Sequence, residues 1–267
     1  MRNLLRGAEL HFHARPGVPR GAELHFHALP GLDDGPSEVE ESLELLRLAV
    51  ADGTGVVVAT PHVRTDFVTD VSDLEDHVRA LQDAADAARI PVRLRRGAEL
   101  GHDMVGRLSQ RELDSVAQGP TSGRWLLVEA PFEAISDVFH EATDELRDRG
   151  FGVLIAHPER SADATLDGAI GLRRELAMGA LAQVNAQSIT GAHGEHANDA
   201  ALRLIAEGLI SVVSSDAHGP TRPPLLGEAR ACLREAGAEA GLCEMLTTSG
   251  PRRLLARGIP RAAALVA

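Results

Sequence analysis

Short apolar runs alternate with longer amphipathic segments along almost the whole chain, and this alternation restricts the fold more than any other feature. The longer segments carry apolar residues at helical spacing, and the short runs have the length of buried strands. This alternation is typical of βα units around a parallel sheet. Seven candidate strands follow from it: Ala22–His27, Val56–Thr60, Val92–Ala98, Trp125–Ala130, Gly152–Ala156, Leu181–Asn185 and Ile210–Ser215.

The number and even spacing of these strands indicate how the sheet is organised. A chain of 267 residues with seven βα units is long enough for one α/β barrel. We therefore predict an α/β fold whose sheet closes, or nearly closes, into a barrel, with an open doubly wound sheet as the alternative. The first connecting helix is predicted over Ser37–Asp52, and Ser37 with Glu40 has capping-box spacing at its start.

A duplicated segment lies at the beginning of the chain. Arg6–Ala14 and Arg20–Ala28 both read RGAELHFHA, and only the second copy continues into Leu-Asp-Asp-Gly. We assign the first barrel strand to the second copy, so residues 22–267 are predicted to form a single domain. Residues 1–21 are predicted to be a poorly ordered extension. A second metal site at His11 and His13 is the alternative.

Side chains that commonly bind metals follow six of the seven predicted strands. In a barrel the C-terminal ends of the strands meet at one face, so residues far apart in sequence can share a site there. The sixth strand is the exception, because it offers only Asn185 and Gln187. The predicted metal ligands are His25, His27, Asp34, His62, Glu99, Glu129, His157, Asp216 and His218.

This set is too large for a single metal ion. A catalytic zinc-type ion takes about three protein ligands, whereas the set contains five imidazoles and four carboxylates. It therefore predicts two or three divalent ions, and ligands without thiolate suit Mn, Fe or Zn. Glu129 is the most informative member, because an acid after Trp-Leu-Leu-Val would be buried at high cost without a cation.

The other histidines after residue 28 serve as a comparison. A single His near a strand end is more often an ordinary polar residue than a metal ligand. We expect five of them to lie at the surface, with His102 and His193 in loops that can reach the site. The five are His77, His102, His140, His193 and His196.

Composition excludes several classes of function. The formal net charge is −12, which argues against binding to nucleic acid. The chain has no Lys, so Schiff-base and P-loop lysines are absent. Neither Cys232 nor Cys243 has an Arg six positions later, so a cysteine-nucleophile phosphatase loop is excluded. No segment has the length of a signal peptide or a membrane span, and we expect a cytoplasmic protein without membrane insertion.

Seven short motifs, taken in order, resemble a known superfamily. They are His-Phe-His, Leu-Asp-Asp-Gly-Pro, Ala-Thr-Pro-His, Arg-Gly-Ala-Glu, Val-Glu-Ala, Ile-Ala-His-Pro-Glu-Arg and Ser-Asp-Ala-His. Together they resemble the polymerase-and-histidinol-phosphatase (PHP) superfamily, and within it the bacterial protein-tyrosine phosphatase branch of the CpsB and YwqE type. The resemblance runs from about Glu23 to Gly250-Pro251-Arg252. It implies the distorted (β/α)7 TIM-like barrel of the PHP fold.

The resemblance also implies how the ligands are shared among three metal ions, with Mn²⁺ expected first and Fe or Zn as alternatives. His25, His27, Glu99 and Asp216 would hold the first ion. The second would bind to Glu99, Glu129 and His157, and the third to Asp34, His62 and His218. Arg160 and Arg222 match the phosphate-contacting arginines of the family, and a guanidinium group near the ligands suits a phosphate. A surface ion pair is the alternative for both.

The family role implied by the resemblance is a metal-dependent protein-tyrosine phosphatase. Its expected partner is a phosphotyrosine protein, the C-terminal tail of a bacterial tyrosine kinase that governs capsule or exopolysaccharide synthesis. Two other functions stay open: a small-molecule phosphatase, such as one acting on histidinol phosphate, and a non-catalytic, metal-binding regulatory barrel.

Overall fold

Parallel strands occupy the centre of the molecule. The computed structural model describes residues 21–166 and 168–260, and every strand pairing within these ranges is parallel. An α/β fold with parallel sheets is therefore confirmed. The strands are β1 (Gly21–Glu23), β2 (Thr54–Ala59), β3 (His62–Val63), β4 (Arg93–Arg96), β5 (Glu99–Leu100), β6 (Trp125–Glu129), β7 (Gly152–Ala156), β8 (Leu181–Asn185) and β9 (Val212–Ser214).

These strands form two sheets. One has the order β1-β2-β4 and the other the order β3-β5-β6-β7-β8-β9. β3 follows β2 after two residues, and β5 follows β4 after Gly97 and Ala98. On the other side, Phe26 forms a parallel bridge with Ala217, just beyond β1 and β9. Each of the seven predicted strands overlaps an observed one, but three are clearly shorter than predicted. Ala22–His27 ends at Glu23 in β1, Ile210–Ser215 shortens to β9, and Val92–Ala98 ends at Arg96 with its path continuing in β5.

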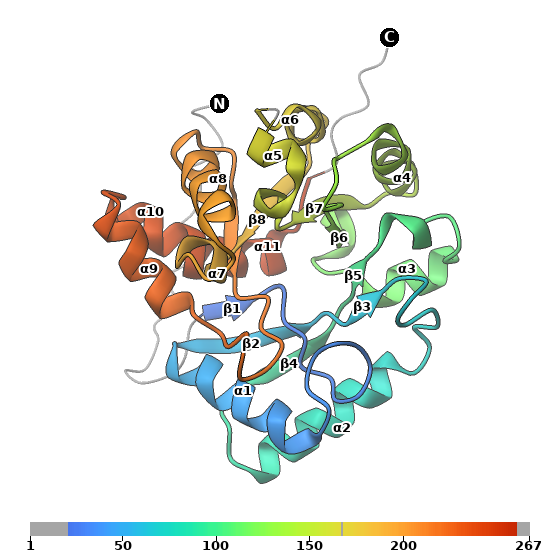
Figure 1. Ribbon diagram of the computed structural model, residues 1–267. Coiled ribbons are helices and arrows are strands. Elements are labelled where there is room, and N and C mark those ends of the chain that lie inside the picture. The colour runs from blue at the N-terminus through green and yellow to red at the C-terminus, as the bar shows by residue number, and fades with distance from the viewer. Residues whose placement is uncertain (1–20, 167, 261–267) are drawn as a thin grey trace.

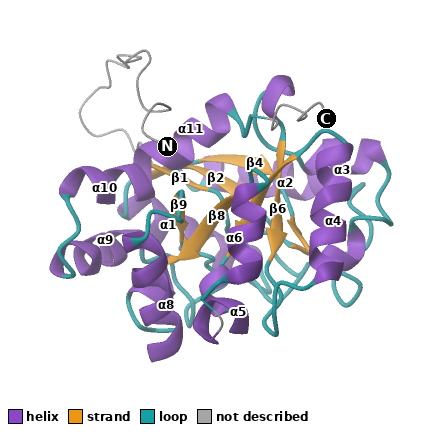
Figure 2. Ribbon diagram, turned by 90° about the horizontal axis from the view of Figure 1, so that it is seen from above, coloured by secondary structure: helices purple, strands orange, loops and turns teal. Residues whose placement is uncertain are grey.

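Helices surround the strands on the outside (Figure 1). The turned view shows the same arrangement, with the strands in the middle and helices around them (Figure 2). The helices are α1 (Val39–Ala51), α2 (Leu74–Ala87), α3 (Gln110–Val116), α4 (Asp137–Asp148), α5 (Ala162–Leu166), α6 (Ile170–Ala177), α7 (Ala186–Ile189), α8 (Glu195–Ala206), α9 (Leu226–Glu235), α10 (Ala240–Glu244) and α11 (Gly250–Arg257).

The predicted first helix forms, but its predicted cap is wrong. The N-cap of α1 is Glu38, which makes no side-chain cap. Ser37 lies one residue too early to cap the helix, and both its backbone N–H and its hydroxyl donate to Glu41. A capping box does form at α3, where the Glu112 N–H donates to Ser109 and the Ser109 N–H donates to Glu112. The capping-box spacing of Ser37 and Glu40 therefore predicts the start of α1 only approximately.

Alternation along the strands divides the core into two clusters. In β6, Trp125 and Leu127 pack into a cluster with Leu254 and Ile259 near the end of the chain, whereas Leu126 and Val128 pack toward the helices. Successive strand residues point to opposite faces, so Glu129 lies on the same face as Trp125 and Leu127. The cluster that contains Trp125 and Leu127 therefore lies toward the N-terminal end of β6, and Glu129 lies at its C-terminal end.

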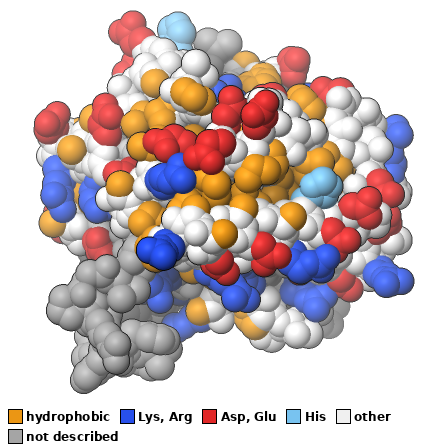
Figure 3. Space-filling view, turned by 90° about the horizontal axis from the view of Figure 1, so that it is seen from below, with side chains coloured by type: hydrophobic (Ala, Val, Ile, Leu, Met, Phe, Trp, Pro, Cys, Tyr) orange, Lys and Arg blue, Asp and Glu red, His pale blue; other side chains and the backbone are white. Residues whose placement is uncertain are grey.

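Charged side chains of both signs cover the face seen from below, where they surround a strip of hydrophobic side chains (Figure 3). Val39 and Leu48 of α1 are among the exposed hydrophobic residues of the described chain. Within residues 21–166 and 168–260, we find no helix with the length and apolar character needed to cross a membrane.

We predict that Gly258→Ala destabilises the fold. Gly258 has φ of 71°, and an added Cβ would lie 1.9 Å from the Gly123 carbonyl oxygen. The Ile259 N–H bonds to that same oxygen, so the backbone has little room to shift. We expect a loss of about 2–4 kcal/mol in the free energy of unfolding, from left-handed strain together with overpacking.

Gly237→Ala is the matched control for this variant. Gly237 has φ of 91°, but no atom lies within 4 Å of its added Cβ. Only the strain of about 1 kcal/mol should remain. Urea unfolding of both variants measures the difference, and equal losses would contradict the predicted clash.

Candidate metal centre and phosphate cavity

The nine predicted ligands lie at or beyond the C-terminal ends of β1, β2, β4, β6, β7 and β9. His25 and His27 follow β1, His62 and Glu99 begin β3 and β5, and Glu129 ends β6. The others lie in loops: Asp34 after β1, His157 after β7, and Asp216 and His218 after β9. Eight of the nine are buried, and only Asp34 is half-exposed.

Four ligand atoms converge at the centre of this cluster. His25 Nε2 lies 3.2 Å from His27 Nε2, and it lies 3.1 Å from both Glu99 Oε2 and Asp216 Oδ1. His27 Nε2 lies 3.3 Å from the same two oxygens. Metal–ligand bonds of about 2.0–2.1 Å, arranged as a tetrahedron, place the ligand atoms about 3.3 Å apart. The spacing of these four atoms therefore fits one ion.

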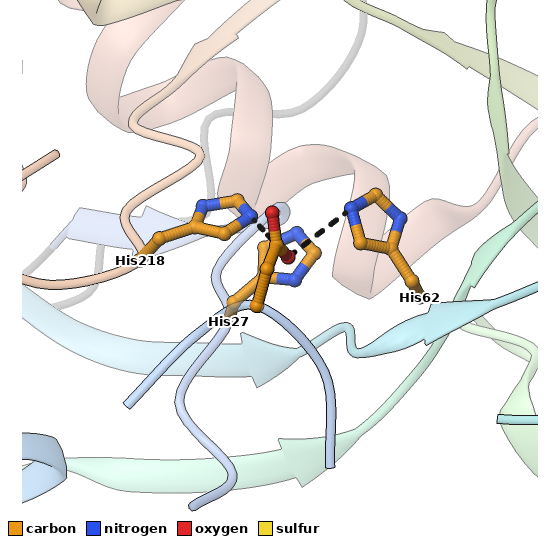
Figure 4. A group of neighbouring side chains, drawn as sticks. His27, His62 and His218 are labelled. Atoms are coloured by element: carbon orange, nitrogen blue, oxygen red, sulfur yellow. Dashed lines mark ion pairs between the residues drawn. The ribbon is translucent and has the colours of Figure 1, made fainter. Parts of the chain in front are cut away.

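A second group surrounds Asp34. Figure 4 shows the imidazoles of His27, His62 and His218 pointing toward one another, and dashed lines mark ion pairs. Asp34 Oδ1 lies 3.2 Å from His218 Nε2 and 3.5 Å from His62 Nε2. These four residues offer ligand atoms within 4.8 Å of one another. The three residues expected at the third ion therefore lie together, and His27 lies with them.

Glu99 connects the groups. Its Oε1 lies 2.8 Å from His157 Nε2, and its Oε2 lies 2.9 Å from His62 Nδ1. His62, Glu99 and Glu129 form a third group with ligand atoms within 4.8 Å of one another. The second predicted ion was expected at Glu99, Glu129 and His157. In the structure, His62 also lies beside the carboxylates of Glu99 and Glu129.

Unpaired buried atoms show that a cation fits this cluster. Four ligand atoms are buried and form no hydrogen bond, although imidazole nitrogens and carboxylate oxygens lie close to one another here. They are His62 Nδ1, Glu99 Oε2, Asp216 Oδ1 and His218 Nε2. His157 Nδ1 is unpaired as well. A buried polar atom without a partner costs about 1–3 kcal/mol. Coordination to divalent ions would satisfy several of these atoms together.

The electrostatics of the cluster favour ionised carboxylates. Burial acts to raise the pKa of Glu99, but the charge of His25 and hydrogen bonds from His157 and other imidazoles hold it well below its usual range. Burial likewise acts to raise the pKa of Asp216, and the nearby imidazoles again outweigh it. Metals bind carboxylates in this ionised form.

Backbone strain occurs at two of the ligands. His157 and Asp216 have φ of 34° and 54°, in the left-handed region. Non-glycine residues adopt this region at a cost of about 1–3 kcal/mol, and such positions cluster at functional sites. Each residue lies directly after or near the end of a strand, where the turn aims its side chain back into the cluster.

Three residues that sequence reasoning did not select hold the ligands in place. Asp33 Oδ2 lies 2.6 Å from His27 Nδ1 and accepts the His62 N–H. Gln183 Oε1 lies 3.0 Å from His25 Nδ1, and Asn185 donates to Asp216 Oδ2. Partners of this kind fix the tautomer and orientation of ligating imidazoles. Alternation along β8 could have shown that Gln183 and Asn185 share a face.

Arginines line a cavity of about 310 Å³ in front of the cluster. Arg222 donates to Asp216 at 2.8 Å, and Arg160 lies 3.6 Å from the same carboxylate. Arg64, which sequence reasoning missed, donates to both oxygens of Glu129. The cavity is therefore lined both by ligand carboxylates and by guanidinium groups that pair with them, and guanidinium groups in this position can bind a phosphate.

Of the five comparison histidines, one is exposed as expected, three are partly buried and one is buried. His196 is exposed, His77 is half-buried, and His102 lines a neighbouring cavity. His193 is half-buried and lies 3.0 Å from the Ser188 hydroxyl. The surface prediction for His140 is wrong: it is 5% exposed and pairs with Glu175. His140 faces the core side of α4, where a buried acid replaces water as its partner.

Comparison with known proteins agrees with this fold and cluster. The profile of the family described as "Capsular polysaccharide synthesis, CpsB/CapC" matches residues 22–256. A putative tyrosine-protein phosphatase, CapC of Staphylococcus aureus, is 28% identical over 73% of this chain and 75% of its own length. Parallel strands that carry clustered metal-binding side chains define an α/β protein of the metal-dependent hydrolase type. Within it, the chain belongs to the CpsB/CapC family.

Solved structures agree as well. A chain from the crystal structures of YwqE from Bacillus subtilis and CpsB from Streptococcus pneumoniae, described as unique metal-dependent tyrosine phosphatases, matches with a TM-score of 0.77. It is 27% identical, and the match covers 90% of this chain and 97% of that one. The phosphotriesterase homology protein of Escherichia coli has the same type of fold, with a TM-score of 0.58 at 14% identity, covering 88% of this chain and 98% of that chain.

We predict that Asp33→Ala weakens metal binding by about 10–100-fold, because His27 loses the carboxylate that orients it. Asp103→Ala is the matched control: Asp103 accepts the Thr65 N–H at the rim of the neighbouring cavity and contacts no ligand. Competition with a chromogenic chelator measures the dissociation constant of Mn²⁺. Equal affinities for the two variants would show that Asp33 has no part in the centre.

Proposed function

We propose that this protein is a metal-dependent phosphoric monoester hydrolase that removes phosphate from tyrosine. One observation carries the proposal: the overlapping ligand groups, which share His27, His62 and Glu99, contribute Asp34, His62, Glu129 and Asp216 to a cavity that Arg160 and Arg222 also line. The relatives in the family are named tyrosine-protein phosphatases, which supports phosphotyrosine as the substrate.

The proposed centre holds two or three divalent ions, with Mn²⁺ first and Fe or Zn as alternatives. Imidazole and carboxylate without thiolate suit all three metals. We further propose that residues 22–267 are one domain, with the two sheets forming a distorted (β/α)7 barrel. Support comes from the continuity of β2 with β3 and of β4 with β5, and from the bridge between Phe26 and Ala217. The duplicated copy with His11 and His13 lies outside the described residues.

When bound, divalent ions supply Lewis acidity that activates water near neutral pH and neutralises phosphate charge. The protein's own residues do the rest. Asp33 orients the His27 imidazole and accepts the backbone N–H of His62, so these ligands need not reorganise during the reaction. Arg160 and Arg222 orient the phosphoryl oxygens and stabilise the charge that develops on them. A phenol has a pKa of about 10, so its phenolate leaves without strong help from an acid.

The proposed partner is a phosphotyrosine protein, namely the C-terminal tail of a bacterial tyrosine kinase in capsule or exopolysaccharide synthesis. The capsular description of the family supports this role. The chain contains no Tyr, so it cannot itself be a substrate of such a kinase. A histidinol-phosphate phosphatase and a non-catalytic regulatory barrel are the competing functions.

Activity assays test the proposal. Protein reconstituted with Mn²⁺ should hydrolyse p-nitrophenyl phosphate and a phosphotyrosine peptide, and a chelator should abolish both activities. His157→Ala should do the same, because His157 contacts Glu99 at the centre of the cluster. His196→Ala, at an exposed position, is the control and should retain full activity. Phosphate release measures each rate.

The competing functions give different results. Hydrolysis of histidinol phosphate without hydrolysis of the peptide would contradict the tyrosine-phosphatase proposal. Metal-loaded protein that hydrolyses none of the three substrates would favour the regulatory barrel.

We predict that Arg160→Ala and Arg222→Ala each lower kcat/KM by about 10²–10³-fold when measured at saturating Mn²⁺. Replacement by Lys should restore only part of the rate, since an ammonium group cannot form the paired hydrogen bonds of a guanidinium. Arg79→Ala is the control, because Arg79 is exposed on α2 and pairs with Asp76. If the three alanine variants retain similar rates, the arginines of the cavity do not bind phosphate.

A further inference from the structure

Two phenylalanines are exposed beside the metal cluster. Among the described phenylalanines, Phe26, Phe139 and Phe151 are at most 3% exposed, whereas Phe67 is 37% and Phe132 is 47% exposed. Both exposed rings line the cavity that contains Arg160 and Arg222. Large apolar rings that stay partly exposed are unfavourable in water, so the shared position of these two in one charged cavity indicates a role in binding.

Each ring is supported by groups of the metal centre. The Phe67 ring stacks on His62, with centroids 5.1 Å apart and an angle of 20°, and the Arg64 guanidinium carbon lies 5.5 Å from its centroid. The Phe132 ring lies parallel to His157, with centroids 6.2 Å apart and an angle of 4°. The Arg160 guanidinium carbon lies 4.8 Å from the Phe132 centroid. The rings are thus held close to both the candidate ligands and the phosphate-binding arginines.

Backbone hydrogen bonds also hold the two segments. The Phe67 N–H donates to the Arg64 carbonyl, and the Val68 N–H donates to the His62 carbonyl. The Phe132 carbonyl accepts the Ala162 N–H at 2.8 Å. Rings that are already fixed in place lose little conformational freedom when a ligand binds, which makes them effective contact surfaces.

We propose that Phe67 and Phe132 bind the aromatic ring of an aryl phosphate and so select phosphotyrosine over phosphate esters of aliphatic alcohols. The proposal rests on the phosphatase function proposed above. The arginines and the ligand cluster handle the phosphoryl group, which is common to all monoesters. A phenyl ring attached to that group reaches the cavity walls and can stack against Phe67 or Phe132. The short chain of a phosphoserine offers no such ring.

Binding of two inert phosphonates tests this selection without any reaction. Phenylphosphonate and methylphosphonate share the charged group and differ in the ring. Mn²⁺-loaded wild type should bind phenylphosphonate more tightly by about tenfold or more, measured by isothermal titration calorimetry. Phe67→Ala and Phe132→Ala should each weaken phenylphosphonate by about three- to tenfold and change methylphosphonate by less than about twofold. Ile170→Ala, which removes another exposed apolar side chain, should change neither.

Several outcomes would overturn the proposal. Equal weakening of both phosphonates would mean that the rings only position His62 or Arg160, and unchanged binding of both would exclude contact with the ligand. Phe67→Leu and Phe132→Leu keep apolar bulk without a flat face, so they should recover only part of the preference. Failure of the phosphatase function would appear separately, as wild-type protein that prefers phenylphosphonate but hydrolyses no phosphate ester.

Discussion

The whole cluster depends on the buried carboxylate of Glu99. It is fully buried, and four imidazoles surround it, from His25, His27, His62 and His157. An isolated carboxylate cannot be removed from water at tolerable cost, so it requires cationic partners. Protonated imidazoles can supply the positive charge that the carboxylate requires. Divalent ions can also supply it, with the ligand atoms in the positions observed. The strand ends serve to bring these groups to the one location where their charges balance.

Rigid support follows from the same constraint. Several ligands meet at spacings near 3 Å, so a small rotation of one imidazole would break contacts with two others. Asp33 and Gln183 oppose such rotations of His27 and His25, and Asn185 holds Asp216. Their side chains are in turn tied to the backbone or to each other. Left-handed backbone at His157 and Asp216 adds strain that the surrounding hydrogen bonds and packing must offset. A site assembled from several strand ends is therefore also a site of local instability, which metal binding would relieve.

The approximate positions of the strand ends could be predicted from sequence because most of the ligands end or follow a short apolar run. The exact ends could not, since Ala22–His27 and Val92–Ala98 both end earlier than predicted. Contacts between loops could not be predicted this way. Asp33 and Asp34 are adjacent, and only the folded loop shows that Asp33 supports His27 while Asp34 faces His62 and His218. The role of Arg64 depends on the path from β3 to Glu129, 65 residues later. His140 was misplaced because its partner, Glu175, comes from a different helix.

Two kinds of recognition meet at this cavity, and they follow from different physical principles. Charge attracts any phosphate monoester to the arginines and ligands, whatever alcohol the phosphate is bound to. Charge alone therefore cannot distinguish a phosphoprotein from a small metabolite. Flat apolar rings add little attraction for the phosphoryl group, but they distinguish between the groups attached to it. Because Arg160 packs on Phe132, one side chain connects both kinds of recognition, and the phosphate position is coupled to the ring position. A cavity of this design gains selectivity without altering the ligands on which the chemistry depends.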